Sequence, residues 1–220
     1  MARTDSGQPV PPRLPDSLST ADEAVLEDDL MWSEVEVKGD FVGQSADDVE
    51  IVASRLTGAR LTGVTIGRLR MVDTIVDSCD LSGAVLRQAS LTRVALRDCR
   101  MSGSDLSLAK LRDVAFVGCK LDDANLRMVT GERVRFDGTV LRSADLYEAR
   151  LVSARFFDCD LTATQLTKAD LGAARLHGST IDAVVGAEHL RGVVIDSAQV
   201  LPLALRLFAS FGIAVDDDRE

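Results

Sequence analysis

Residues 104–126 read SDLSL-AKLRD-VAFVG-CKLDD-ANL, which repeats one five-residue unit: a small residue, a variable residue, a large apolar residue and two further variable positions. The same register runs from Ile51 to Ile181, where 26 of the 27 residues met at steps of five are apolar. The residues two positions earlier are mostly small: ten Ala, six Val, four Cys, three Thr, three Ser and one Leu. Because a period of five fits neither a helix nor a strand, each unit must turn a corner and direct two side chains toward a shared axis.

These units resemble the repeats of the pentapeptide repeat family, whose pattern is a small residue, Asp or Asn, Leu or Phe, and two variable residues. Several units depart from it by carrying Arg at the second position, as at Arg100. The resemblance covers about residues 41–200 and implies an all-β solenoid, a right-handed quadrilateral β-helix in which four units make one square coil. It implies about seven coils, stacked about 4.8 Å apart. The best-matching units are Ser104-Asp105-Leu106, Ala124-Asn125-Leu126, Ala144-Asp145-Leu146 and Ala169-Asp170-Leu171.

The four cysteines agree with a square coil. Cys79, Cys99, Cys119 and Cys159 all fall at the small inward position, with spacings of 20, 20 and 40 residues, so they belong to one column. We expect them to be reduced core residues, because a free cysteine behaves as a small buried hydrophobe. A linear inward stack cannot easily surround a tetrahedral metal ion, and no CxxC pair is present. The Cα spacing of stacked neighbours leaves a disulfide open.

Gly131 is the one lapse in the row of large residues. An empty position in a tight core would cost about 2–5 kcal/mol. We therefore expect a local bulge, a small loop, or filling of the space by Met128. If the space were unfilled, Gly131→Leu would stabilise the protein.

The N-terminal region follows a different pattern. Residues 1–18 carry four of the five prolines and show no periodicity, and we predict that they are disordered. Residues 19–48 are predicted to cap the coil with a short helix from Thr20, which opens a capping-box spacing, to about Leu30, and with a strand over 32–37. The coil itself is expected over residues 49–200.

The C-terminal region predicts a helix over residues 201–214, after a candidate N-cap at Ser197 and before an acidic tail over 215–220. The coil register slips by one before this helix. Because the helix is apolar almost all round, one side can close the end of the rod while the other needs a partner. We expect an end-to-end homodimer, as in known members of the resembled family; the alternative is a helix that folds back and is satisfied in a monomer. The candidate dimer residues are Leu201, Leu205, Phe208 and Phe211.

The net charge of −10 is concentrated at the two ends of the chain. Residues 1–31 carry seven acids and two bases, residues 32–50 six and one, and residues 215–220 four and one. Residues 51–214 hold 18 acids and 21 bases, a net charge of +3. The rod is therefore close to neutral.

The sequence offers no constellation typical of an enzyme. It has two histidines and no nucleophile elbow, phosphate-binding loop or dinucleotide fingerprint, so we expect neither catalysis nor a cofactor. It also lacks an apolar run of membrane-spanning length and an apolar N-terminal leader, and we expect a cytoplasmic protein with no membrane partner.

Two functions remain for such a rod. The first is a scaffold whose solenoid faces bind an unidentified protein partner, with a column of Arg135, Arg155 and Arg175 as the candidate surface. The second is implied by the family resemblance: a DNA mimic that regulates a type II topoisomerase such as DNA gyrase, by inhibition or by quinolone protection. The nearly neutral rod favours the scaffold, because a mimic needs negative charge where phosphates would lie. Direct nucleic-acid binding ranks last, since the acidic ends oppose it.

Overall fold

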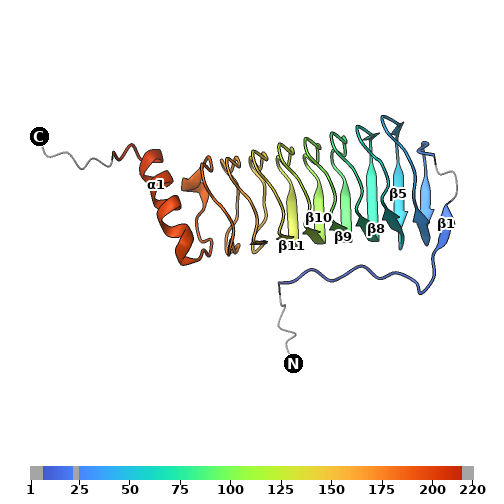
Figure 1. Ribbon diagram of the computed structural model, residues 1–220, viewed down its shortest axis with the longest axis horizontal. Coiled ribbons are helices and arrows are strands. Elements are labelled where there is room, and N and C mark those ends of the chain that lie inside the picture. Colours follow the sequence, from blue (N-terminus) through green and yellow to red (C-terminus); the bar gives the residue numbers. More distant parts are fainter. Residues whose placement is uncertain (1–6, 22–24, 215–220) are drawn as a thin grey trace, which may run out of the picture.

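The chain forms a rod of stacked coils with a helix at one end (Figure 1). The computed structural model describes residues 7–21 and 25–214. Within them lies a parallel β-solenoid of about 7 turns, which confirms the fold class expected from the five-residue repeat. The strands are β1 (Ser19–Ala21), β2 (Met31–Ser33), β3 (Val35–Val37), β4 (Ser45–Ala46), β5 (Val49–Val52), β6 (Arg55–Thr57), β7 (Thr65–Ile66), β8 (Leu69–Asp77), β9 (Ser90–Arg97), β10 (Lys110–Val117), β11 (Thr130–Asp137) and β12 (Arg155–Phe157).

Strand pairing is parallel and follows the coil repeat. The main sheet runs in the order β1-β3-β6-β8-β9-β10-β11-β12, β5 pairs with β2 and β8, and β4 pairs with β7 in a second sheet. Leu111 of β10 pairs with Leu91 and with Gly131, each 20 residues away. At both ends the offset falls to 19, as in the pairs Trp32–Ile51 and Arg175–Val194. The slip expected near the C-terminus is thus present, and a matching one occurs at the N-terminus.

The core is a set of columns in which identical positions of successive coils stack on one another. Phe116, Phe136 and Phe156 form such a column, with ring centroids 4.9 and 4.7 Å apart and interplanar angles of 5° and 6°. These spacings match the rise of about 4.8 Å between neighbouring β-strands. Inward side chains can therefore touch only if each coil repeats the register of the one below it.

The N-terminal end of the rod differs from its prediction. Residues 19–21 form β1 instead of opening a helix, and residues 25–30 are not helical. The backbone of this segment pairs with the first coil, since Ser19 N donates to Glu34 O at 3.1 Å. The expected strand over 32–37 is present as β2 and β3, separated at Glu34, whose φ is 58°. Parallel pairing thus begins at β1, where Ser19 pairs with Val35, and β2 pairs with β5 from Met31, both ahead of the expected coil start at residue 49.

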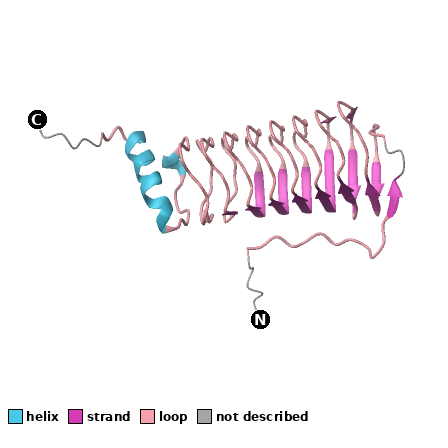
Figure 2. Cartoon of the chain, viewed as in Figure 1, coloured by secondary structure: helices cyan, strands magenta, loops and turns pink. Residues whose placement is uncertain are grey.

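Residues 7–18 are likewise ordered against the rod, where the sequence predicted disorder (Figures 1 and 2). Val10 N donates to Asp113 Oδ1 and Arg13 N donates to Asp73 Oδ1, both at 3.0 Å. A segment without a hydrophobic period is therefore held by hydrogen bonds to distant residues. Residues 1–6 of the predicted disordered tail lie outside the described residues.

The C-terminal end closes with two short 3₁₀ helices, η1 (Ala187–His189) and η2 (Ser197–Gln199), and with α1 (Val200–Ser210) (Figure 2). The N-cap of η2 is Asp196, whose side chain accepts from Ala198 N, and not the expected Ser197. Helix α1 ends four residues before the predicted limit of 214, and the acidic tail over 215–220 lies outside the described residues.

Gly131 does not interrupt the coil. Strand β11 passes through it in register, so neither a bulge nor a loop is present. Met128 is 40% exposed and does not fill the space either. A Cβ at Gly131 would lie 2.5 Å from Leu151 Cδ2 and 2.7 Å from Val134 Cγ2. Neighbouring side chains thus occupy the room that a larger residue would need.

Candidate interaction surface

The predicted Arg135, Arg155 and Arg175 form one vertical row, here called the arginine column. Arg135 pairs with Arg155 in the parallel register, and Arg155 forms a bridge with Arg175. Pairing on successive coils brings the three side chains to the same face of the rod, as the coil repeat predicted. The column is half-buried at Arg135 and Arg155 and exposed at Arg175.

Aromatic side chains lie next to this column. The guanidinium carbon of Arg135 lies 5.6 Å from the ring centroid of Phe157, and Arg135 Nη2 contacts Asp137 Oδ2 at 2.6 Å. Phe157 in turn meets the edge of His177, with centroids 6.2 Å apart and an interplanar angle of 78°. Arginine over an aromatic face is a common arrangement in protein-binding surfaces, because both residue types are enriched there. The face therefore combines positive charge with flat apolar area.

Elsewhere on the rod, opposite charges on neighbouring coils pair with one another. The exposed pairs among them add little to stability, but every pair neutralises charge locally and so opposes a face of one sign. The pairs separated by one coil repeat are Arg60–Asp40, Arg68–Asp48, Arg70–Glu50, Arg93–Asp73, Arg112–Glu132, Arg133–Asp113 and Lys168–Glu148.

Four of these residues form a continuous row at one corner of the rod, here called the charge ladder: Asp73, Arg93, Asp113 and Arg133. Arg93 binds Asp73 through Nε at 2.6 Å and Nη2 at 2.5 Å. Arg133 binds Asp113 through the same two nitrogens at 2.6 and 2.9 Å. These guanidinium forks hold the pKa of both carboxyl groups below the usual range. The sequence signal was the alternation of Asp and Arg two residues after the large inward position, which the inward pattern alone does not reveal.

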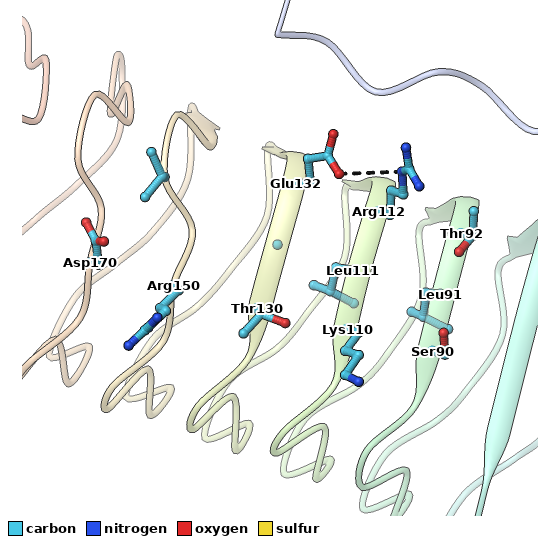
Figure 3. A pocket seen from close by; sticks show the side chains of 12 residues that line it. Ser90, Leu91, Thr92, Lys110, Leu111, Arg112, Thr130, Glu132, Arg150 and Asp170 are labelled. Carbon is cyan, nitrogen blue, oxygen red and sulfur yellow. Dashed lines mark ion pairs between the residues drawn. The ribbon is translucent and has the colours of Figure 1, made fainter.

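The residues that precede the ladder on β9, β10 and β11 line a shallow groove of about 580 Å³ (Figure 3). Its rims combine Lys110, Arg112 and Arg150 with Glu132 and Asp170, and Arg112 Nε lies 3.5 Å from Glu132 Oε2. Leu91 and Leu111 point inward beneath these rims. The groove thus places side chains of both charges over the backbone of the three strands.

The cysteine column lies inside the rod, as predicted. Cys79, Cys99, Cys119 and Cys159 are buried and free, so no disulfide joins stacked neighbours. Burial raises the pKa of Cys79 to about 12 and that of Cys159 to about 11. Within residues 7–21 and 25–214, no group of three or more His, Cys, Asp or Glu side chains could hold a metal ion.

Helix α1 covers the C-terminal end of the rod with Leu203, which is buried, and with Leu207. The predicted dimer residues lie on its other sides: Leu201, Leu205, Phe208 and Phe211 are 68%, 50%, 40% and 67% exposed. The described helices include none that is long and apolar enough to cross a membrane.

Comparison with known proteins agrees with this architecture. The sequence matches the profile described as "Pentapeptide repeat region" over residues 49–126 and 109–185. A search of curated proteins finds no match.

Among solved structures, full-length QnrB1, a plasmid-mediated fluoroquinolone resistance protein, is 19% identical with a TM-score of 0.41, covering 86% of this chain and 99% of its own. HetL, a pentapeptide repeat protein involved in heterocyst differentiation regulation from Nostoc sp. strain PCC 7120, is 19% identical with a TM-score of 0.34, covering 76% and 87%. Since the profile match spans more than half of the chain, the chain belongs to the pentapeptide repeat family.

Proposed function

We propose that this chain is a non-enzymatic scaffold that binds an acidic segment of a protein partner through one face of its solenoid. The observation that carries the proposal is the arginine column with Phe157 and His177 beside it. The three arginines lie on successive coils about 4.8 Å apart, and carboxylates are the groups that guanidinium groups bind best, as the contact of Arg135 with Asp137 illustrates. The reduced, buried cysteines are in keeping with a cytoplasmic site of action.

Support for a non-enzymatic role comes from the same surface. Several acidic side chains of the rod are engaged in ion pairs, as with Asp73 on Arg93 and Asp160 on Arg142. The groove of Figure 3 is open and shallow, whereas sites for small molecules are concave and enclose most of the ligand. Binding of an extended surface fits this geometry better than chemistry does.

A charge-reversal experiment tests the arginine column. Arg155→Glu combined with Arg175→Glu should abolish capture of the partner by the full-length chain. The matched control, Arg60→Glu with Arg142→Glu, makes the same change of charge at exposed arginines outside the column and should leave capture intact. Capture of the same proteins by the wild type and both variants would refute the proposal.

The second candidate function, DNA mimicry toward a type II topoisomerase, draws on the family of the chain and is opposed by its charge pattern. Residues 51–214 carry a net charge of +3, and acids on the coils pair with bases of the next coil. A supercoiling assay with purified gyrase separates the two hypotheses. Inhibition or quinolone protection by a substoichiometric amount of the chain would support mimicry, and no effect at tenfold excess would reject it.

The chain is further proposed to act as an end-to-end homodimer through α1. The exposed apolar side chains Leu201, Leu205 and Phe211 supply the reason, since a helix apolar on several sides is stabilised by burial on each of them.

A further inference from the structure

Residues 7–18, here called the N-terminal strap, run along the rod ahead of β1 (Figure 1). The strap reads GQPVPPRLPDSL and contains four prolines. Proline fixes φ near the value of the polyproline II helix, an extended conformation whose backbone makes no internal hydrogen bonds. The amides of the strap must therefore find partners outside it, and the charge ladder provides a partner for two of them, Val10 and Arg13.

The hydrogen bonds between strap and ladder follow a simple geometric match. Val10 N donates to Asp113 Oδ1 and Arg13 N to Asp73 Oδ1, both at 3.0 Å. The donors are three residues apart, which spans about 9.3 Å in polyproline II. The acceptors are two coils apart, which spans about 9.6 Å at the strand spacing. Three residues of the strap thus cover the same distance as two coils of the rod. The ladder residue at each of the two bonded positions is an aspartate.

The prolines select these two amides. Between Pro9 and Pro15 only Val10, Arg13 and Leu14 have an N–H to donate, and the first two of them bind the ladder. The acceptor at Asp113 is almost fully buried, with a side-chain exposure of 5%. A buried carboxylate is stabilised only when its oxygens are satisfied, and here Arg133 and the strap amide share that role.

The floor beside the ladder is apolar over the coils that the strap crosses. Ile75, Ala95 and Ala115 lie at the same position of three successive coils. On the coil before them this position is Arg55, and on the coil after them it is Arg135. Ile75 and Ala95 are only 8% and 6% exposed, although they do not belong to the core cluster of inward residues.

Several strap residues are half-buried in turn, among them Pro9, Pro12 and Leu14. The ladder and this apolar floor together are called the strap groove.

We propose that the strap groove is a binding site for a proline-rich polyproline II peptide, and that the chain occupies it with its own strap. The specificity comes from two free amides spaced three residues apart between prolines, read by Asp113 and Asp73, and from prolines packed on the apolar floor. A proline-rich segment of a partner then binds in competition with the strap. Because Gly7 lies next to Arg155, departure of the strap also uncovers part of the arginine column. The inference does not depend on the proposed function.

A peptide-binding experiment tests the site. The probe is a fluorescent synthetic peptide with the sequence of residues 7–18, and the receptor is the full-length chain in which residues 8–15 are replaced by Gly and Ser at equal length. Saturable binding is expected by fluorescence anisotropy, and at least about tenfold weaker binding to the wild type, whose own strap competes. No binding to the replaced chain would overturn the proposal.

Modified peptides provide the matched controls without altering the protein. N-methylation at Val10 and Arg13 removes the two donors and should weaken binding at least about tenfold. N-methylation at Leu14, whose amide does not bind the ladder, should leave binding nearly unchanged. Equal binding of all three peptides would show that hydrogen bonds from the peptide backbone to the ladder do not contribute to binding, and the proposal would be wrong.

A measurement on the wild type keeps the proposal testable if the replaced chain does not fold. Amide hydrogen exchange at Val10 and Arg13 should be slower than at Leu14, and excess unmodified peptide should accelerate it by displacing the strap. The doubly N-methylated peptide should have no such effect. Exchange that is unaffected by the unmodified peptide would contradict a competitive site.

Discussion

Thiol and hydroxyl side chains of the cysteine column, which also contains Thr139, connect several coils to the one below. Cys99 Sγ, Cys119 Sγ and Thr139 Oγ1 donate to the carbonyl oxygens of the large inward residues 23 positions earlier, at 3.4, 3.5 and 3.1 Å. At other corners a backbone amide closes the turn, as Ala124 N does with Leu121 O at 3.1 Å. In the described residues no such turn bond is made by Cys99, Cys119 or Thr139. The column is therefore rich in small donors for a reason beyond their volume.

Thr139→Val should destabilise the protein by about 1–2 kcal/mol, because it keeps the shape of the side chain and removes its hydrogen bond to Phe116 O. For a chain of this size the melting temperature should fall by about 2–8 °C. Thr139→Cys, which copies the neighbouring coils, serves as the control and should lose less. Equal losses in the two variants would show that the donor contributes nothing.

Gly131→Leu should destabilise the protein, whereas the same substitution at an empty core position would stabilise it. Its Cβ would lie 2.5 Å from Leu151 Cδ2 and 2.7 Å from Val134 Cγ2, and overpacking of this kind costs about 1–3 kcal/mol. Gly172→Ala is the control, since its nearest contact is Asp170 Oδ1 at 3.4 Å. Denaturant unfolding of both variants measures the difference; a more stable Gly131→Leu protein would disprove the packing argument.

At the scale of single elements, the C-terminal cap replaces a missing coil. Gln199 is buried, and its Nε2 donates to the carbonyl oxygens of Leu176 and Ser179 at 2.5 and 2.6 Å. Its Oε1 accepts from Asp196 N at 3.0 Å. One side-chain amide thus satisfies carbonyl groups of the last coil, and α1 follows directly from it.

The exposed side of α1 predicts the oligomeric state. The wild type should have twice the 23.6 kDa mass of one chain in light scattering at micromolar concentration. Leu205→Glu with Phe208→Glu should give a monomer, because two charges cannot be buried unpaired in an apolar interface. Val152→Glu, at a position 49% exposed on the rod, is the control and should remain dimeric. A monomeric wild type would reject the dimer.

At the scale of the whole molecule, the strap joins residues that are 103 and 60 positions apart in the sequence. Its anchoring carboxylates have lowered pKa values, for which the arginine forks are the main cause. Each therefore favours the paired state above the ordinary aspartate pKa, and this contribution is lost as the pH falls from about 4 through the lowered pKa.

The amide resonances of Val10 and Arg13 should accordingly titrate with midpoints below about pH 4 as the strap detaches. The amide of Ala124, which binds the carbonyl of Leu121, is the internal control and should not follow them. Midpoints at or above the ordinary value would show that the two aspartates do not hold the strap.

Much of the fold could be predicted because each coil repeats one local rule. The inward positions of Cys79 to Cys159, the 20-residue column spacing and the late register slip near Leu190 all follow from counting along the chain. The arginine column was predictable for the same reason. The N-terminal helix was not: Thr20 and Glu23 have capping-box spacing, but residues 19–21 pair as strand β1 with β3 instead.

The inside of the rod thus follows from the sequence alone. Every five-residue unit repeats the same two inward positions, so counting along the chain identifies the residues of the core. Only the tertiary structure decided what lies against its outside. The strap comes from residues 7–18, whereas the charge ladder and the apolar floor share strands β8 to β11, and each looks ordinary alone. Hydrogen bonds between a non-periodic segment and a column become visible only when stacking has brought Asp73 and Asp113 to a spacing that the strap can match.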